Sequence, residues 1–326
     1  MIDREANAPI FFIGMPRSGT TVLFDAFSVH PDLAWFSQHV DRFPRFPAIA
    51  VLSRVADLSD STRRAISRSD QARPWLEKLR VGPSEAYNVW ERCCGEKFRF
   101  SYLLGVEATS KERECVHKRV GQVLRLQGKA RFSAKLTGPG RIGYLTSIFP
   151  DATFVHVIRD GRAVVQSLMR VPFWQEWRMS QPAWQGGLSD ADLADWQGRD
   201  RSPIALAAIQ WRKVTTSIRA ESARVAADRY AEIHYERFVS EPHQTLDELM
   251  ELLNLPHSSR PHQFLEGRFD LRNMNFQWAE SLSRGDVRML DELLSSTLSE
   301  FGYDRIDPGE YSDTNRVEQP FASADD

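Results

Sequence analysis

The stretch Gly14–Thr21, GMPRSGTT, has the residue types that bind an anion at the start of a helix. Its two glycines, Gly14 and Gly19, allow the backbone to turn sharply and to approach a ligand closely. The amides from Ser18 to Thr21 would point at the ligand from a helix N-terminus, whose partial positive charge favours anions. Arg17 adds a guanidinium that can hold an oxyanion through two hydrogen bonds. Hydroxyl donors follow at Thr20 and Thr21.

The loop lacks the lysine of nucleotide-hydrolysing P-loops. Their pattern is GxxxxGK[ST], in which the lysine reaches the terminal phosphates and the hydroxyl holds Mg²⁺. Here Thr20 stands at the lysine position, and the apolar strand FVHVIRD ends in Arg159 before its Asp160. The sequence therefore favours a ligand with a shorter anionic tail and no metal.

A second candidate anion site lies in VIRDGRAVVQS, residues 157–167. Arg159 is expected at the carboxyl end of a strand, the edge at which the first loop also lies. Ser167 follows eight residues later and could reach the same anion if the turn at Gly161 folds back tightly. Spacing alone leaves open a solvated or ion-paired turn with Ser167 on an ordinary helix face.

Together these segments resemble the sulfotransferases that use 3′-phosphoadenosine 5′-phosphosulfate (PAPS), especially the tyrosylprotein-type and bacterial members. The family loop P-[KR]-[ST]-G-[TS]-[TS] stands here as Pro16–Thr21, and its later arginine and serine as Arg159 and Ser167. The resemblance implies that Arg159 and Ser167 bind the 3′-phosphate. It implies that the 5′-phosphosulfate is bound by Arg17, Ser18, Gly19, Thr20 and Thr21.

The resemblance extends to Lys135, to YERFVSEP and to NMNFQWAESLS, and is weakest between residues 48 and 129. It implies transfer of the sulfuryl group of PAPS to a hydroxyl or amine acceptor by in-line displacement. Desulfated PAP would be the product, and no metal is expected. Such reactions depend on positioning and on positive charge at the transferred group. Arg17 would stabilise the leaving phosphate, and Lys135 would contact the sulfuryl group or the bridging oxygen.

The general base is left open by the sequence. Tyrosylprotein-type relatives carry a glutamate where this chain has Gln38, and cytosolic small-molecule members carry a histidine where it has Thr137. His39 is the catalytic candidate with the best unperturbed pKa for a base. Asp41 is a nearby alternative, and Glu85 a more remote one. A surface histidine without a catalytic role is an equally good interpretation of His39.

Two other functions are compatible with the loop. A P-loop small-molecule or nucleoside kinase would bind ATP with magnesium, against which the missing lysine argues. A non-catalytic PAP-binding protein would bind the product nucleotide and transfer nothing, which the unassigned base leaves open.

Three strand–turn–helix units must position these residues. Their strands are predicted at residues 10–13, 131–136 and 153–158, and YAEIHYERFV, residues 230–239, is predicted as a last strand. Strands that each feed a helix form a mostly parallel sheet with helices on both faces, and their turns meet at its carboxyl edge. We predict an α/β, P-loop-type three-layer fold.

Composition and patterning set the remaining expectations. We predict a single domain at residues 1–308, with a mainly helical insert at 48–129, a tryptophan-rich lid at 171–201 and a disordered tail at 309–326. The formal net charge of −2 indicates no nucleic-acid partner, so the acceptor is expected to be a small molecule or a side-chain hydroxyl. No apolar run approaches the roughly 18 residues of a membrane span, and the polar N-terminus suggests a cytoplasmic protein. Nothing indicates an oligomeric state.

The three cysteines, Cys93, Cys94 and Cys115, have neither a disulfide framework nor zinc-site spacing. We expect reduced thiols that pack as small apolar side chains, and no structural metal.

Overall fold

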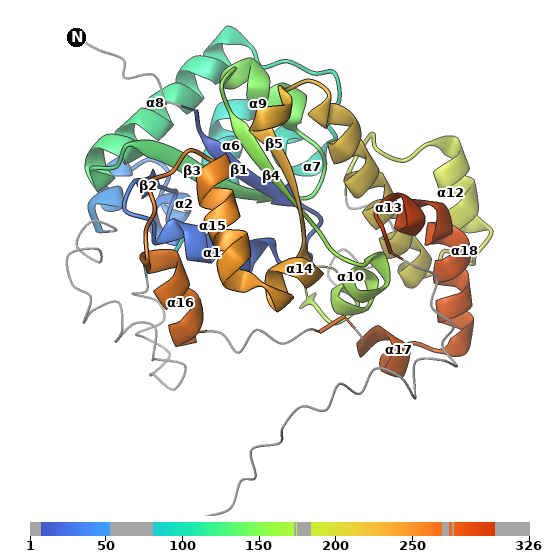
Figure 1. The fold of residues 1–326 in the computed structure, drawn as a ribbon. Coiled ribbons are helices and arrows are strands. Elements are labelled where there is room, and N and C mark those ends of the chain that lie inside the picture. Colours follow the sequence, from blue (N-terminus) through green and yellow to red (C-terminus); the bar gives the residue numbers. More distant parts are fainter. Residues whose placement is uncertain are drawn as a thin grey trace, which may run out of the picture.

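The computed structural model describes residues 8–52, 81–172, 174, 184–268, 274–275 and 277–303. Five strands of this part of the chain form one parallel sheet in the order β2-β3-β1-β4-β5 (Figure 1). They are β1 (Ile10–Gly14), β2 (Leu33–Ala34), β3 (Arg131–Thr137), β4 (Thr153–Ile158) and β5 (Tyr230–His234). The three strands predicted for the strand–turn–helix units are confirmed.

Helices cover both faces of the sheet (Figure 1). Ile10 and Phe12 of β1 pack on one face, against α1 (Thr20–Ser28), α14 (Tyr235–Ser240), α15 (Pro242–Leu252) and α16 (Arg260–Arg268). Phe11 and Ile13 pack on the other, against α6 (Tyr87–Cys94), α8 (Ser110–Gln127), α9 (Ile142–Ile148), α13 (Pro203–Ser222) and α18 (Arg284–Glu300). Alternate side chains of a strand point to opposite faces, so both sides of β1 are buried. The predicted three-layer α/β fold is confirmed.

Shorter elements complete the described chain. They are α2 (Gln38–Arg42), η1 (Pro47–Ala50), α7 (Lys97–Phe100), α10 (Gly161–Leu168), α12 (Asp190–Gln197), η3 (Ala227–Arg229) and α17 (Gln277–Ser281). The insert predicted as mainly helical holds η1, α6, α7 and α8, and the predicted lid holds α12. Insert residues 53–80, lid residues 173 and 175–183, and the predicted tail 309–326 lie outside the described residues. None of the described helices is long and apolar enough to cross a membrane.

The predicted last strand is wrong in its second half. β5 ends at His234, and helix α14 begins at the next residue, Tyr235. His234 pairs with Ile158, the last residue of β4, so the sheet offers no partner beyond this point. The change from strand to helix follows from the length of the neighbouring strand.

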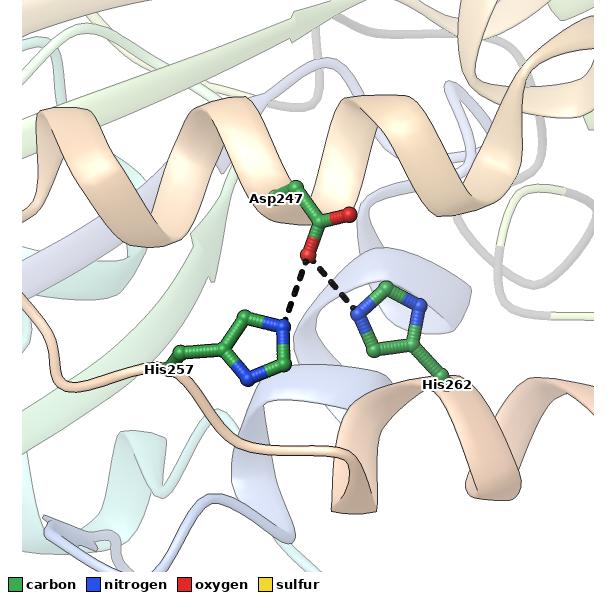
Figure 2. A group of neighbouring side chains, drawn as sticks. All are labelled: Asp247, His257 and His262. Carbon is green, nitrogen blue, oxygen red and sulfur yellow. Dashed lines mark hydrogen bonds and ion pairs between the residues drawn. The ribbon is translucent and has the colours of Figure 1, made fainter.

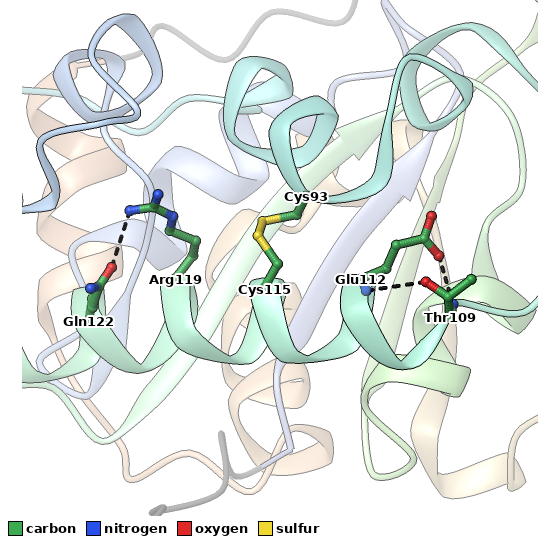
Figure 3. Close-up of a disulfide and its surroundings, with 6 residues drawn as sticks. All are labelled: Cys93, Thr109, Glu112, Cys115, Arg119 and Gln122. Carbon is green, nitrogen blue, oxygen red and sulfur yellow. Dashed lines mark hydrogen bonds between the residues drawn. A yellow bond between two sulfur atoms is a disulfide. The ribbon is translucent and has the colours of Figure 1, made fainter.

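The expectation of three free thiols is also wrong. Cys93 of α6 and Cys115 of α8 form a disulfide with a Cα–Cα distance of 5.4 Å (Figure 3). The two cysteines are 22 positions apart, and only the packing of α6 beside α8 brings them together. For a closed loop of this length, chain entropy gives a stabilisation of about 3 kcal/mol. Cys94 is a buried free thiol, and burial raises its pKa to about 11.

Candidate functional site

The first loop has the backbone geometry that its glycines predicted. Gly19 precedes helix α1 with φ 87°, and Arg17 also adopts a positive φ, 75°. A Cβ at Gly19 would lie 2.5 Å from the ring of Tyr235, so both the φ angle and the space require glycine here. The loop therefore ends directly at the N-terminus of α1, the arrangement that binds anions.

Arg17 projects from this loop toward Ser167, in the last turn of α10. Its Nε donates a hydrogen bond to Ser167 Oγ at 2.9 Å, although the two residues are 150 positions apart. The Arg17 side chain is solvent-exposed, so its guanidinium remains accessible to a ligand. The structure thus brings the first loop and the predicted second anion site together.

Arg159 binds the backbone of the same loop through a hydrogen bond. Its Nη1 donates to the Arg17 carbonyl at 3.1 Å, and its guanidinium lies 4.4 Å from the ring centroid of Tyr235. Arg159 is 8% exposed, and burial lowers its pKa, with neighbouring Tyr235 opposing that shift. An arginine remains charged in proteins, so this cation lies at the carboxyl edge of β4 as predicted.

Lys135 lies near the end of β3, next to the loop. Its Nζ donates to Thr21 Oγ1 at 2.8 Å and forms an ion pair with Glu85 Oε1 at 3.2 Å. The lysine side chain is 14% exposed and the glutamate side chain 21% exposed, so solvent only partly screens the pair. The predicted anion-binding loop, the lysine and one candidate base therefore form a connected group.

Glu85 reaches this position because its segment pairs with the residues before α2. Ser37 and Pro83 form an antiparallel bridge, the Gln38 amide donates to the Gly82 carbonyl at 3.1 Å, and the Ser84 amide donates to the Phe36 carbonyl at 2.9 Å. These contacts place the segment that leads into Glu85 beside the start of α2.

A second contact holds the Glu85 carboxylate at the end of β3. Thr137 donates its hydroxyl to both carboxylate oxygens, at 3.0 and 2.9 Å, and its amide to Oε2 at 3.3 Å. The Glu85 carboxylate thus lies beside Thr137, the position at which cytosolic small-molecule members of the resembling family carry their base. From the sequence, Glu85 was expected to be the more remote candidate.

His39 and Asp41 are differently engaged. Asp41 Oδ1 accepts the Asn88 amide at 2.9 Å near the start of α6, and burial raises the pKa of this carboxyl. His39 lies on α2, where its side chain forms no hydrogen bond or ion pair with any other described residue. Neither residue forms a hydrogen bond or an ion pair with Lys135 or Thr21 within the described chain.

Two residues of the site were missed by sequence reasoning. Asn275 Oδ1 accepts a hydrogen bond from Arg159 Nε at 2.8 Å, and Tyr235 lies against both Gly19 and Arg159. Asn275 belongs to the NMNFQWAESLS segment, which carried part of the family resemblance without an assigned role. Tyr235 was hidden because its segment was interpreted as a continuous strand.

Comparison with known proteins identifies relatives of this arrangement. Residues 9–259 match the family described as the sulfotransferase family. Protein-tyrosine sulfotransferase 1 of Danio rerio is 25% identical over 251 residues, which are 77% of this chain and 54% of that protein. The chain therefore spans about half the length of this curated relative.

Solved structures agree in fold. The sulfotransferase STF9 from Mycobacterium avium aligns with a TM-score of 0.54 at 21% identity, over 93% of this chain and 79% of that chain. The sulfotransferase STF1 from Mycobacterium tuberculosis H37Rv aligns with a TM-score of 0.51 at 15% identity, over 89% and 77%. At these identities the structural likeness concerns the fold.

Proposed function

The chain belongs to the sulfotransferase family, and from this premise we propose that it transfers the sulfuryl group of PAPS to a hydroxyl or amine acceptor, releasing PAP. The observation that carries the proposal is the convergence of three cations, Arg17, Lys135 and Arg159, on one glycine-containing loop. A nucleotide with anionic groups at both its 5′ and its 3′ position needs cations at two places. The group offers Arg159 on one side of the loop and Lys135 on the other.

The loop also fits a closely approaching phosphosulfate. A Cβ at Gly14 would lie 2.4 Å from the Val157 carbonyl oxygen, and one at Gly19 would lie 2.5 Å from the ring of Tyr235. Neither position therefore has room for a side chain, and the backbone turns tightly there. The Ser18–Thr21 amides, with the Thr20 and Thr21 hydroxyls, would bind the 5′ end of the nucleotide. Arg159 and Ser167 would bind its 3′-phosphate. Among the described residues, this group contains no cluster of three histidine, cysteine, aspartate or glutamate side chains that could hold a metal ion. We propose a reaction without a metal.

Lys135 and Glu85 would carry the transfer itself. Lys135 Nζ, already bonded to Thr21, would stabilise charge that gathers on the bridging oxygen as the sulfur–oxygen bond breaks. Glu85 would accept the proton of the acceptor hydroxyl while the new oxygen–sulfur bond forms. We therefore propose Glu85 as the general base in preference to His39 or Asp41, because its carboxylate lies 3.2 Å from Lys135.

Nucleotide binding is tested by thermal unfolding with PAP. PAP at one hundred times its dissociation constant should stabilise the protein by about 2.7 kcal/mol and raise its Tm by several degrees. Arg17→Ala and Arg159→Ala should lose most of this increase, because each removes a charge-assisted bond worth about 1.5–3 kcal/mol. Arg125→Ala, an exposed arginine on α8, serves as the matched control and should keep the full increase.

Two further arms separate the alternatives. A Tm increase with ATP and magnesium but none with PAP would favour the kinase and contradict our proposal. A PAP-dependent increase without turnover of PAPS, on a panel of phenols, alcohols, amines and tyrosine peptides, would indicate a non-catalytic PAP-binding protein. The acceptor class, small molecule or protein side chain, would follow from the same panel.

We also propose the cytoplasm as the compartment, supported by a cysteine content of three in 326 residues, far from that of a disulfide-dense secreted domain. The Cys93–Cys115 disulfide argues in the other direction, because cytosolic thiols are kept reduced. If the protein is cytoplasmic, lysis of the source cells directly into a denaturing alkylating buffer should modify all three cysteines, because the Cys93–Cys115 bond would be kept reduced in the cell. Modification of Cys94 alone would instead place the protein in an oxidising compartment.

A further inference from the structure

A cluster of two imidazoles and one carboxylate lies on α15, α16 and the segment that connects them (Figure 2). Asp247 comes from α15, His257 from the connecting segment and His262 from α16. One potential ligand atom of each lies within 4.8 Å of the other two. None of these residues takes part in the nucleotide site described above.

The three ligand atoms have distances suited to a small divalent cation. Asp247 Oδ1 lies 2.9 Å from His262 Nε2 and 3.5 Å from His257 Nε2. Zinc bonds of about 2.0–2.2 Å to nitrogen and oxygen place the ligand atoms of a tetrahedral site about 3.3–3.6 Å apart. A small movement of exposed side chains would therefore complete three corners of a tetrahedron and leave one for water.

The charges of the cluster are also suitable. Among the described residues, Asp247 forms ion pairs only with His257 and His262. The next carboxylate of the same helix, Glu248, is instead paired with Arg237 at 2.7 Å. Neutral imidazoles and a carboxylate without a lysine or arginine partner form the donor set that zinc and related transition metals prefer.

A second pair of residues supports the central histidine. His243 Nδ1 lies 2.8 Å from His262 Nδ1, with the two rings stacked, and His243 Nε2 lies 3.8 Å from Glu266 Oε1. If His262 Nε2 binds a cation, its ring proton resides on Nδ1 and is donated to His243. His243 then carries its own proton on Nε2, facing Glu266. A ligating histidine that donates its second nitrogen to a fixed acceptor is the usual support of a metal site.

Four residues of this region form two pairs with helical spacing, one on α15 and one on α16. His243 and Asp247 are four residues apart on α15, and His262 and Glu266 are four residues apart on α16, so each pair lies on one face of its helix. His262 is only 15% exposed and anchors the cluster, whereas His257 at 75% and Asp247 at 50% leave it open to ions from solvent.

We propose that Asp247, His257 and His262 form a binding site for a divalent transition-metal ion of the zinc type, with His243 and Glu266 orienting His262. The ion would link α15 to α16, and α16 packs against α1, the helix that follows the anion-binding loop. Its role is to brace the helical layer behind that loop. The site does not depend on the proposed transfer reaction.

Zinc titration of the full chain, free of any affinity tag, tests the proposal by calorimetry, with Co²⁺ absorption as a report of tetrahedral geometry. We expect one Zn²⁺ per chain and a Tm that rises by several degrees and returns on chelation. Asp247→Asn, His257→Ala and His262→Ala should each weaken binding by more than His243→Gln, for which a loss of about 10–100-fold is expected.

Two matched variants complete the experiment. His117→Ala removes a histidine of α8 that bonds the Ile148 carbonyl, and Glu248→Gln removes the carboxylate next to Asp247. Both should bind Zn²⁺ as the wild type does. The proposal is overturned if the wild type shows no saturable binding, or if His257→Ala and His262→Ala bind as tightly as the wild type. His257 is so exposed that its substitution should leave the metal-free Tm unchanged, which separates loss of the site from loss of the fold.

Discussion

Replacing Glu85 with glutamine is expected to lower kcat by about 10²–10⁴-fold, the range contributed by general acid–base catalysis. Glutamine keeps the size of the side chain and can still accept the Thr137 hydroxyl, so the end of β3 should retain its geometry. It cannot accept the acceptor's proton. PAP should bind Glu85→Gln with nearly wild-type affinity, because Glu85 contacts the lysine and the threonine of the site rather than the loop amides.

The measurement is PAP release from PAPS with the best acceptor from the panel, compared across phenols of different acidity. The loss should be smallest for a phenol that is already ionised at the assay pH, since such an acceptor needs no base. A uniform loss for all phenols would show that Glu85 acts by position alone.

His39→Ala and Asp41→Asn are the matched tests of the rival bases. We expect both to keep kcat within a few-fold of wild type, since neither side chain forms a hydrogen bond or an ion pair with Lys135 or Thr21 in the described chain. The Tm of Asp41→Asn should be measured as well, because Asp41 accepts a hydrogen bond from the Asn88 amide. A loss in His39→Ala comparable to that expected for Glu85→Gln would transfer the role of base to His39.

Replacing Lys135 with methionine should lower kcat by about 10²–10³-fold, as for the loss of one preorganised donor to developing charge. Methionine has a similar length and fills the same space, but cannot donate to Thr21 or to the bridging oxygen. The effect on PAP affinity should be much smaller than on kcat, because the charge that Lys135 stabilises develops only as the bond to sulfur breaks.

Single-turnover release of PAP, together with PAP binding, separates the two quantities. Lys118→Met, an exposed lysine on α8, is the matched control and should react at the wild-type rate. Lys135→Arg is expected to restore little, because a planar guanidinium does not occupy the position of a compact ammonium group. Equal losses of PAP affinity and of kcat in Lys135→Met would instead assign Lys135 to ground-state binding.

The candidate site could be predicted where its functional residues belong to short contiguous motifs. The Gly14–Thr21 loop, the turn at Arg159 and the strand that carries Lys135 each combine an apolar run, a turn and a helix start within about 20 positions. Because parallel strands present their carboxyl ends at one edge, three such units sufficed to place Arg17, Lys135 and Arg159 together. The contacts of Arg17 with Ser167 and of Lys135 with Thr21 are the result.

The missed features all depend on contacts with distant segments, which a local sequence pattern does not identify. β5 ends at His234, which pairs with the last residue of β4, Ile158, and Tyr235 then begins a helix. Cys93 and Cys115 bond because α6 and α8 pack side by side. The spacing of those cysteines resembles no disulfide framework, and the hydrophobic period of YAEIHYERFV does not reveal where its sheet partner stops.

By itself the sequence determined the parallel α/β fold, the anion-binding loop and the cations around it, because strand and helix periods and turn chemistry are properties of short stretches. Only the tertiary structure decided which carboxylate joins Lys135. Glu85 lies 50 positions before that lysine and reaches it through the bridge between Ser37 and Pro83. The cluster of Asp247, His257 and His262 is of the same kind, since α15, the connecting segment and α16 each contribute one of its residues. Contacts between segments far apart are set by how whole layers pack, and that packing is the sum of many weak interactions that no single motif records.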